Sequence, residues 1–151
     1  GNHANTVTGA APSVAEIEKL VAKLSVQKGL DGSHLNLQPL YLMGPVALHA
    51  TLLMLINKEF KAAKASDVNP YASILKGVIV DSRLDASSTS KWYVVSSKEE
   101  IDMIELGTLD GQGPQLNVEE VFGTGMKMDI LHDVGVGLID HRGFTGNGTF
   151  A

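Results

Sequence analysis

The first part of the chain shows the spacing of an amphipathic helix. Four apolar residues recur at the i, i+3, i+4 and i+7 positions that line one helix face: Ile17, Leu20, Val21 and Leu24. Ser13 and Glu16 have the spacing of a capping box, in which each side chain binds an unpaired backbone N–H at the helix start. Gly29 is a typical helix stop. The pattern therefore predicts a helix over residues 14–28.

A short apolar run and a second helical pattern come next. The run 40–43 is bounded by Gly44 and Pro45, which is typical of a buried strand. Pro45 suits the first position of a helix, so the pattern predicts a helix from Val46 to about Lys64. Its expected buried positions are Leu48, Leu52, Leu55 and Ile56.

The rest of the chain is typical of strands joined by turns. Aromatic, β-branched and apolar runs predict strands over residues 78–80, 91–95, 101–109 and 118–122. A serine-rich turn is expected over residues 85–91, and a hairpin-like turn at Asp110-Gly111. Small and polar residues predict a disordered or extended leader over 1–12 and a glycine-rich tail over 143–151.

The longest alternation in the chain runs from residue 126 to residue 138. Every second position in it is apolar or histidine: Met126, Met128, Ile130, His132, Val134, Val136 and Leu138. A period of two places these side chains on one face of a strand. Because Gly135 and Gly137 interrupt the other face, we expect a long strand with a bulge or bend at the glycines.

Composition narrows the class of protein. With 151 residues, 44% hydrophobic and 19% charged, the chain is expected to fold as one globular domain. A net charge of −5 disfavours direct binding to nucleic acid. The absence of cysteine excludes disulfides, cysteine zinc sites, iron–sulfur clusters and thiol nucleophiles. Polar residues and prolines interrupt the apolar stretch 35–56, so no membrane span is expected, and the polar start lacks the basic region of a signal peptide.

Two histidine–aspartate pairs are the best candidates for metal binding or acid–base chemistry. They are His132-Asp133 and Asp140-His141, and one hypothesis is a small α/β enzyme or ligand-binding domain that uses both pairs. Alternation along a strand, however, directs His132 and Asp133 to opposite faces. No Walker A, GxGxxG, GxSxG or EF-hand pattern occurs, and the sequon at Asn147 is expected to be accidental. We therefore expect a protein that is not an enzyme, with no catalytic, cofactor or metal site.

Several segments, taken in order, are similar to one known family. The stretch 20–57, LVAKLSVQKGLDGSHLNLQPLYLMGPVALHATLLMLIN, contains the pattern G-x-x-L-x-L-x-P-x-x-L-x-x-P-x-x-L at Gly32, Leu35, Leu37, Pro39, Leu42, Pro45 and Leu48. It is followed by NPYASILKGVIVDSRLD, by Trp92-Tyr93, by LGTLDGQGPQLNVEEVF and by GMKMDILHDVGVGLIDHRGFTGNG. Over residues 13–148 the series resembles tailed-phage major capsid proteins of the Hong Kong ninety-seven type. Within them it looks most like Mu-like prophage major head subunits and the capsid part of protease–capsid fusions.

The resemblance implies an α+β fold with a mixed or antiparallel sheet. Residues 13–28 would be the spine helix, 29–120 the axial domain and 121–143 the strands of the peripheral domain. Residues 1–12 would be a flexible leader or tag remnant, and 144–151 a tail. The arm and loop that lock neighbouring subunits in such families would precede residue 13, so the chain is expected to be a C-terminal fragment.

The resemblance also implies a function. The protein would be a structural subunit that self-assembles into hexamers and pentamers and encloses DNA in an icosahedral phage or prophage capsid. Its partner would be itself, with packaged double-stranded DNA met only indirectly and no membrane involved. Assembly would take place in the bacterial cytoplasm. No cofactor is implied, and the fragment alone is expected to be a monomer or a small oligomer.

Overall fold

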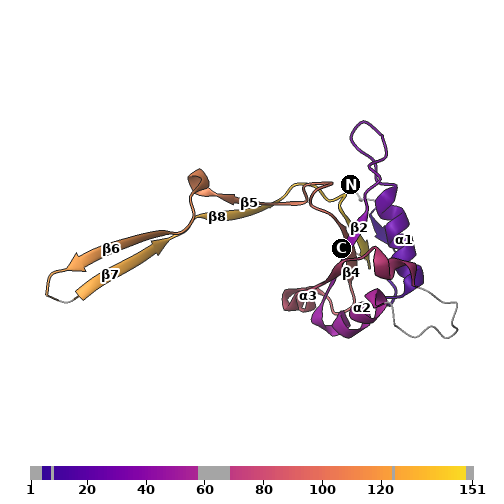
Figure 1. The fold of residues 1–151 in the computed structure, drawn as a ribbon, viewed down its shortest axis with the longest axis horizontal. Coiled ribbons are helices and arrows are strands. Elements are labelled where there is room, and N and C mark those ends of the chain that lie inside the picture. The colour runs from indigo at the N-terminus through magenta and orange to yellow at the C-terminus, as the bar shows by residue number, and fades with distance from the viewer. Residues whose placement is uncertain (1–4, 8, 58–68, 124, 149–151) are drawn as a thin grey trace.

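The structure consists of a body that contains one sheet and a long β-arm that extends from it (Figure 1). It is a computed structural model, and it describes residues 5–7, 9–57, 69–123 and 125–148. We call residues 104–138 the arm and the other described residues the body. Helices and strands are mixed along the chain, so the predicted α+β class is confirmed.

The body sheet has five strands in the order β1-β9-β4-β2-β3. These strands are β1 (Thr6–Val7), β2 (Pro39–Gly44), β3 (Gly77–Val80), β4 (Trp92–Ser96) and β9 (Phe144–Asn147). β2 runs parallel to β3 and antiparallel to β4, β4 is antiparallel to β9, and β1 is parallel to β9. The expected mixed sheet is therefore present, with the predicted runs 40–43, 78–80 and 91–95 as three of its strands.

The helices of the body are α1 (Val14–Ser25), α2 (His49–Ile56) and α3 (Ser82–Ser87). α1 begins as predicted, because the Ser13 hydroxyl accepts a hydrogen bond from the Glu16 amide at 3.3 Å. It ends three residues before the predicted Lys28. The chain turns back there, with Gly29 N donating to Ser33 O at 2.8 Å and Leu35 N to Gln27 O at 2.9 Å.

The second predicted helix is divided and shorter than expected. A 3₁₀ turn, Val46–Leu48, precedes α2, and Pro45 is the cap before that turn rather than its first residue. The backbone at Asn57 is extended, and the predicted residues 58–64 lie outside the described part of the chain. Leu52 and Leu55 are buried as expected, while Leu48 and Ile56 are partly buried.

The predicted serine-rich turn over 85–91 is wrong in its first half, where α3 forms. The Asp81 carboxylate caps this helix by accepting from the Arg83 amide at 2.8 Å. Within α3, Asp85 accepts from the amides of Val46 and Ala47 at 2.8 and 3.2 Å and so caps the neighbouring 3₁₀ turn. A run of serines suggested a loop, but the two aspartates supply the N-terminal caps that a short helix needs. A second 3₁₀ turn, Pro70–Ser73, precedes β3.

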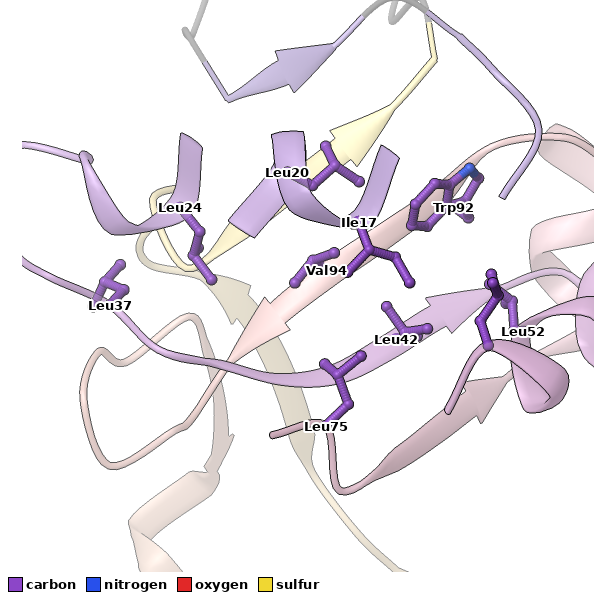
Figure 2. Packing of buried hydrophobic residues seen from close by; sticks show 10 residues of the cluster. Ile17, Leu20, Leu24, Leu37, Leu42, Leu52, Leu75, Trp92 and Val94 are labelled. Atoms are coloured by element: carbon purple, nitrogen blue, oxygen red, sulfur yellow. The ribbon is translucent and has the colours of Figure 1, made fainter. Parts of the chain in front are cut away.

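The core lies between α1, the sheet and α2 (Figure 2). Ile17, Leu20 and Leu24 of α1 are fully buried, as their spacing predicts. They pack with side chains of the sheet and α2, of which Leu42, Leu52, Trp92 and Val94 are fully buried. The single tryptophan is fully buried and its indole N–H donates to Ala10 O at 3.2 Å.

Segments near both chain ends join the sheet as β1 and β9, and β9 lies where the composition predicted a polar tail. Residues 144–147 form β9, and its residues Thr145 and Asn147 are buried. The Asn147 side chain accepts from the Ala10 amide at 2.6 Å and donates to the Glu16 carboxylate at 3.1 Å. Polar and glycine-rich composition predicted a tail, but these polar groups are satisfied inside the body by specific hydrogen bonds.

Candidate functional site

The arm consists of two successive two-stranded ribbons. The inner ribbon pairs β5 (Ile104–Thr108) with β8 (Val134–Leu138), and the outer ribbon pairs β6 (Gln115–Val121) with β7 (Gly125–Leu131). Both pairs are antiparallel. In Figure 1 the inner ribbon leaves the body and the outer ribbon continues outward from it.

A joint separates the two ribbons. On one side, Asp110 and Gly111 have positive φ values of 52° and 68° in the short turn Leu109–Gly111, so the expected turn is present. This turn joins β5 to β6, which do not pair with each other, so it is not the tip of a hairpin. On the other side lie His132 and Asp133, and the Leu109 amide donates to Asp133 O at 3.2 Å.

The long strand predicted over 126–138 is divided at this joint. The predicted irregularity at Gly135 and Gly137 is wrong, because these glycines pair in regular register with Gly107 and Glu105. The break falls instead at His132–Asp133, where the partner strand is interrupted by the turn. The sequence of one strand could not reveal a discontinuity that its partner imposes.

The inner ribbon has one apolar face. Residues opposite each other in an antiparallel pair share a face, and the register places Ile104 with Leu138 and Leu106 with Val136. Thr108 and Val134 complete this face. The opposite face carries only Glu105 and three glycines: Gly107, Gly135 and Gly137.

The outer ribbon also has one apolar face and one mainly polar face. One face carries five apolar side chains and Glu120: Leu116, Val118, Met126, Met128 and Ile130. The other face is mainly polar, with Gln115, Asn117, Glu119, Lys127 and Asp129, and it also carries Val121 and Leu131. Lys127 and Asp129 form an ion pair at 2.7 Å on this face.

We define the apolar face of the arm as the ten side chains on the apolar faces of the two ribbons: Ile104, Leu106, Val134, Val136, Leu138, Leu116, Val118, Met126, Met128 and Ile130. Each of them is between 50% and 73% exposed. Phe122, in the turn at the tip, is fully exposed. Two-stranded ribbons are marginally stable in water, and folded monomers rarely expose more than a few hundred Å² of contiguous apolar surface. Such a face indicates a contact surface.

Charge is also concentrated in the arm. It contains six acidic residues (Glu105, Asp110, Glu119, Glu120, Asp129 and Asp133) and one basic residue, Lys127. The whole net charge of −5 therefore lies in the arm, and the rest of the chain carries eleven acidic and eleven basic residues.

The two histidine–aspartate pairs of the sequence analysis do not converge. His132-Asp133 lies at the joint of the arm, and Asp140-His141 lies where the arm meets the body. Between them runs β8, whose five residues span about 17 Å at 3.4 Å per residue. Asp133 lines a hollow of about 170 Å³ at the joint, and Asp140 and His141 line a different, open groove of about 560 Å³. The geometry does not supply the shared pocket that the enzyme or ligand-binding hypothesis requires.

Asp140 has a structural role at the arm root. Its carboxylate accepts from Arg142 Nε at 2.9 Å and from the Arg142 amide at 2.8 Å, and Arg142 Nη1 donates to Lys28 O at 3.2 Å. We call these three residues the clasp. The hydrogen bonds from the Arg142 side chain lower the pKa of Asp140. His141 Nδ1 lies 4.0 Å from the same carboxylate.

Other polar side chains of the body also have local hydrogen-bond partners. Glu100 accepts from the Gln38 amide at 2.8 Å, and the Ser88 hydroxyl accepts from the amides of Ser90 and Lys91 at 3.3 Å. Among the described residues, no group of three histidine or acidic side chains is arranged to hold a metal ion. None of the described helices is both long and apolar enough to cross a membrane.

Comparison with known proteins identifies the family. The phage capsid protein family matches residues 1–147, nearly the entire chain. The chain belongs to the phage capsid protein family. No curated protein matches it. Among solved structures, a virus-like particle from Pyrococcus furiosus aligns with 94% of this chain and 54% of that chain, at 14% sequence identity and a TM-score of 0.43. The chain thus spans about half the length of that neighbour.

The phage capsid protein family is a family of structural proteins. In a phage capsid protein the residues of interest are those that contact other molecules, and the sequence analysis did not single out the arm as such a surface. The sequence did contain a signal for an apolar face, because apolar residues recur at every second position in β5 and in most of β6, as they do in residues 126–138. Alternation usually means one buried and one solvated face in a sheet within a single domain, so it does not by itself indicate a contact surface.

Proposed function

We propose that this phage capsid protein is the major head subunit of a tailed phage or prophage, with a fold of the Hong Kong ninety-seven type. Its copies form hexamers and pentamers that enclose double-stranded DNA in an icosahedral shell. The family match over residues 1–147 is the observation that carries this proposal. The Mu-like head subunits and protease–capsid fusions are the relatives that its motifs resemble.

The exposed arm supports an assembling subunit. A shell protein needs large surfaces that are repeated by symmetry, and such surfaces are incompletely covered in a single copy. Ten apolar side chains, each at least half exposed, are a surface of this kind. The net negative charge of the arm also disfavours close contact with DNA, so we propose that packaged DNA is met only indirectly.

Within this fold we assign α1 to the spine helix and residues 29–103 to the axial domain, which the resemblance extended to residue 120. Residues 121–143 were assigned to the peripheral strands by resemblance. Since β6 begins at Gln115 and pairs with β7, we propose that the arm as a whole is the unit that corresponds to those strands. Assembly is proposed to take place in the bacterial cytoplasm.

Negative-stain electron microscopy tests the proposed function. The chain is purified by itself and as part of its complete open reading frame, and both samples are imaged at several concentrations. Shells or capsomer rings from either sample support the proposal. Small particles alone from both samples would contradict it.

A further inference from the structure

We infer that Asn147-Gly148, at the end of β9, is a deamidation site that the segment before α1 keeps closed. We call residues 5–7 and 9–12 the pre-helix segment. When this segment leaves the sheet the site opens, and the reaction then prevents the segment from returning. The inference concerns residues of the body alone, so it does not depend on the proposed function.

The sequence supplies the reactive pair. Asn147-Gly148 is the single Asn-Gly dipeptide among the 151 residues. Because glycine has no Cβ and a permissive backbone, its amide nitrogen can reach the carboxamide of a preceding asparagine. The Gly148 nitrogen attacks Asn147 Cγ, and the new C–N bond closes a succinimide ring. The Cγ–Nδ2 bond breaks, and Nδ2 leaves as ammonia with the proton of the Gly148 amide. Water then opens the ring to give aspartate or isoaspartate.

In the folded chain each reacting group is held by a hydrogen bond. The Gly148 amide, which has to give up its proton, donates to Val7 O at 3.0 Å. The Asn147 carboxamide oxygen accepts from the Ala10 amide at 2.6 Å, and its Nδ2 donates to Glu16 Oε2 at 3.1 Å. Asn147 is also only 1% exposed to water. Ring closure requires the carboxamide to rotate toward the Gly148 nitrogen, so it requires these hydrogen bonds to break.

Most of this protection comes from the pre-helix segment. β1 pairs with β9 in a register that places Val7 opposite Asn147. Gly9 passes so close to the reactive pair that a Cβ at this position would lie 3.3 Å from Gly148 Cα. Ala10 supplies the amide that holds the carboxamide. Departure of this one segment therefore breaks two of the three hydrogen bonds on the reacting groups.

The pre-helix segment can leave without unfolding the body. β1 is an edge strand of two residues, and none of the described residues of the segment is fully buried. Side-chain hydrogen bonds also hold it: Asn5 Nδ2 donates to His141 O at 3.2 Å and to Phe144 O at 3.1 Å, and Lys23 Nζ donates to Thr6 O. Segments with few buried contacts open at a lower free energy than a packed core. Local opening of the segment is thus the step that opens the site.

The reaction removes the contact to which the segment would return. In the aspartate product an oxygen replaces Asn147 Nδ2, so a carboxylate faces the Glu16 carboxylate where a hydrogen bond was. Like charges this close repel, and the Glu16 side chain is only 12% exposed. Lys19 pairs with the other Glu16 oxygen at 2.5 Å, so one lysine would serve two carboxylates. Isoaspartate instead lengthens the backbone and displaces the Gly148 amide from Val7 O.

The first test is peptide mapping by mass spectrometry, since replacing the carboxamide NH₂ by OH changes the mass of the peptide that contains Asn147. The chain is incubated in mildly alkaline buffer, folded and in guanidinium chloride. When reaction requires opening, its rate follows the open fraction. We therefore expect Asn147 to deamidate at least about tenfold more slowly in the folded chain. Equal rates in the folded and unfolded chains would overturn the inference.

A matched pair of variants tests the role of the pre-helix segment. Asn5→Ala removes two hydrogen bonds that hold the segment and leaves the partners of Asn147 in place. Asn117→Ala makes the same change on the polar face of the outer ribbon. Far-UV circular dichroism verifies that both variants are folded. We expect Asn147 to deamidate about fivefold or more faster in Asn5→Ala, and at the unaltered rate in Asn117→Ala. Equal rates in the two variants would overturn the inference.

The effect of the product is tested with Asn147→Asp. Hydrogen exchange of the Gly146 and Gly148 amides, which donate to the pre-helix segment, reports whether the segment is docked. We expect these amides to exchange at least about tenfold faster in Asn147→Asp. The double variant Asn147→Asp, Glu16→Gln has one neutral partner, so it is expected to recover most of the protection. Full protection in Asn147→Asp, or no recovery in the double variant, would overturn the inference that the reaction prevents return.

Discussion

At the residue scale, a few polar side chains fix the ends of the chain and the root of the arm. Asn147 connects β9 to the segment at the start of α1, because it contacts Ala10 and Glu16, which are more than 100 positions away in the sequence. The clasp connects the end of the arm to the loop after α1. The sequence did not reveal these structural roles, since each residue acts through a partner that folding brings near.

Replacing Asn147 by alanine is expected to destabilise the body. The substitution removes both hydrogen bonds and leaves the Ala10 amide without its acceptor, which costs about 1–3 kcal/mol. Urea unfolding followed by Trp92 fluorescence measures the change. Asn117→Ala, on the exposed polar face of the outer ribbon, is the matched control and is expected to stay within about 0.5 kcal/mol. Equal losses in the two variants would show that Asn147 has no anchoring role.

The clasp is expected to weaken in acid. Hydrogen bonds from Arg142 hold the pKa of Asp140 below its usual value, so the contribution of the carboxylate is complete above the unfolded pKa of about 3.9. It is lost as the pH falls through the lower pKa of the folded state. Hydrogen exchange of the Ile139 and Asp140 amides, both of which donate to Met103 O, measures this loss as a fall in protection from pH 6 to pH 3.

Two variants identify the carboxylate responsible. In Asp140→Asn the protection of the arm root is expected to be low at both pH values. Asp31 also has a pKa lowered by hydrogen bonding, to Ser33 in the loop after α1, so Asp31→Asn is expected to keep the pH dependence. Loss of the pH dependence in Asp31→Asn but not in Asp140→Asn would contradict this role of the clasp.

At the element scale, a regular apolar pattern has opposite outcomes in the body and in the arm. The apolar stripe of α1 is buried against the sheet, as amphipathic helices usually are. The alternation of β5 to β8 is as regular, but both faces of these strands are open to solvent. A pattern therefore predicts the element and its apolar side, while the surface that covers this side depends on what lies next to it.

Replacing a buried leucine by alanine is expected to cost more stability than replacing an exposed leucine. Leu24 is fully buried in the core, so Leu24→Ala removes packing and leaves a cavity, at a cost of about 2–5 kcal/mol. Leu30 is 99% exposed in the loop after α1, and Leu30→Ala is expected to change stability by less than about 0.5 kcal/mol. Urea unfolding compares the two. A cost at Leu30 similar to that at Leu24 would show that Leu30 has a covering partner in solution.

At the scale of the whole molecule, the chain combines a packed body with an arm that lacks a core of its own. The buried cluster contains residues of α1, α2 and the sheet, and no residue of 104–138 belongs to it. Stability is therefore expected to be uneven, with the arm opening at a lower free energy than the body.

Hydrogen exchange of the whole chain measures this unevenness. Amides of β6 and β7 are expected to exchange faster than those of β2 and β4 in the monomer. Arm amides that are as protected as those of the body in the monomer would contradict the marginal stability of the arm.

The sequence by itself determined the elements whose signals are local. The Ser13 cap and the 3.6-residue spacing gave α1, the apolar runs gave β2, β3 and β4, and the alternation gave the strands of the arm. Its ordered motifs pointed to a phage capsid protein, which the family match confirmed.

Only the tertiary structure decided which groups meet. It placed Phe144–Asn147 in the sheet, because the polar side chains of β9 find partners on residues more than 100 positions away. It also placed the two histidine–aspartate pairs at opposite ends of β8 and left the apolar face of the arm uncovered. Periodicity depends on neighbours along the chain, whereas burial and hydrogen bonding depend on neighbours in space, and those neighbours exist only once the chain has folded.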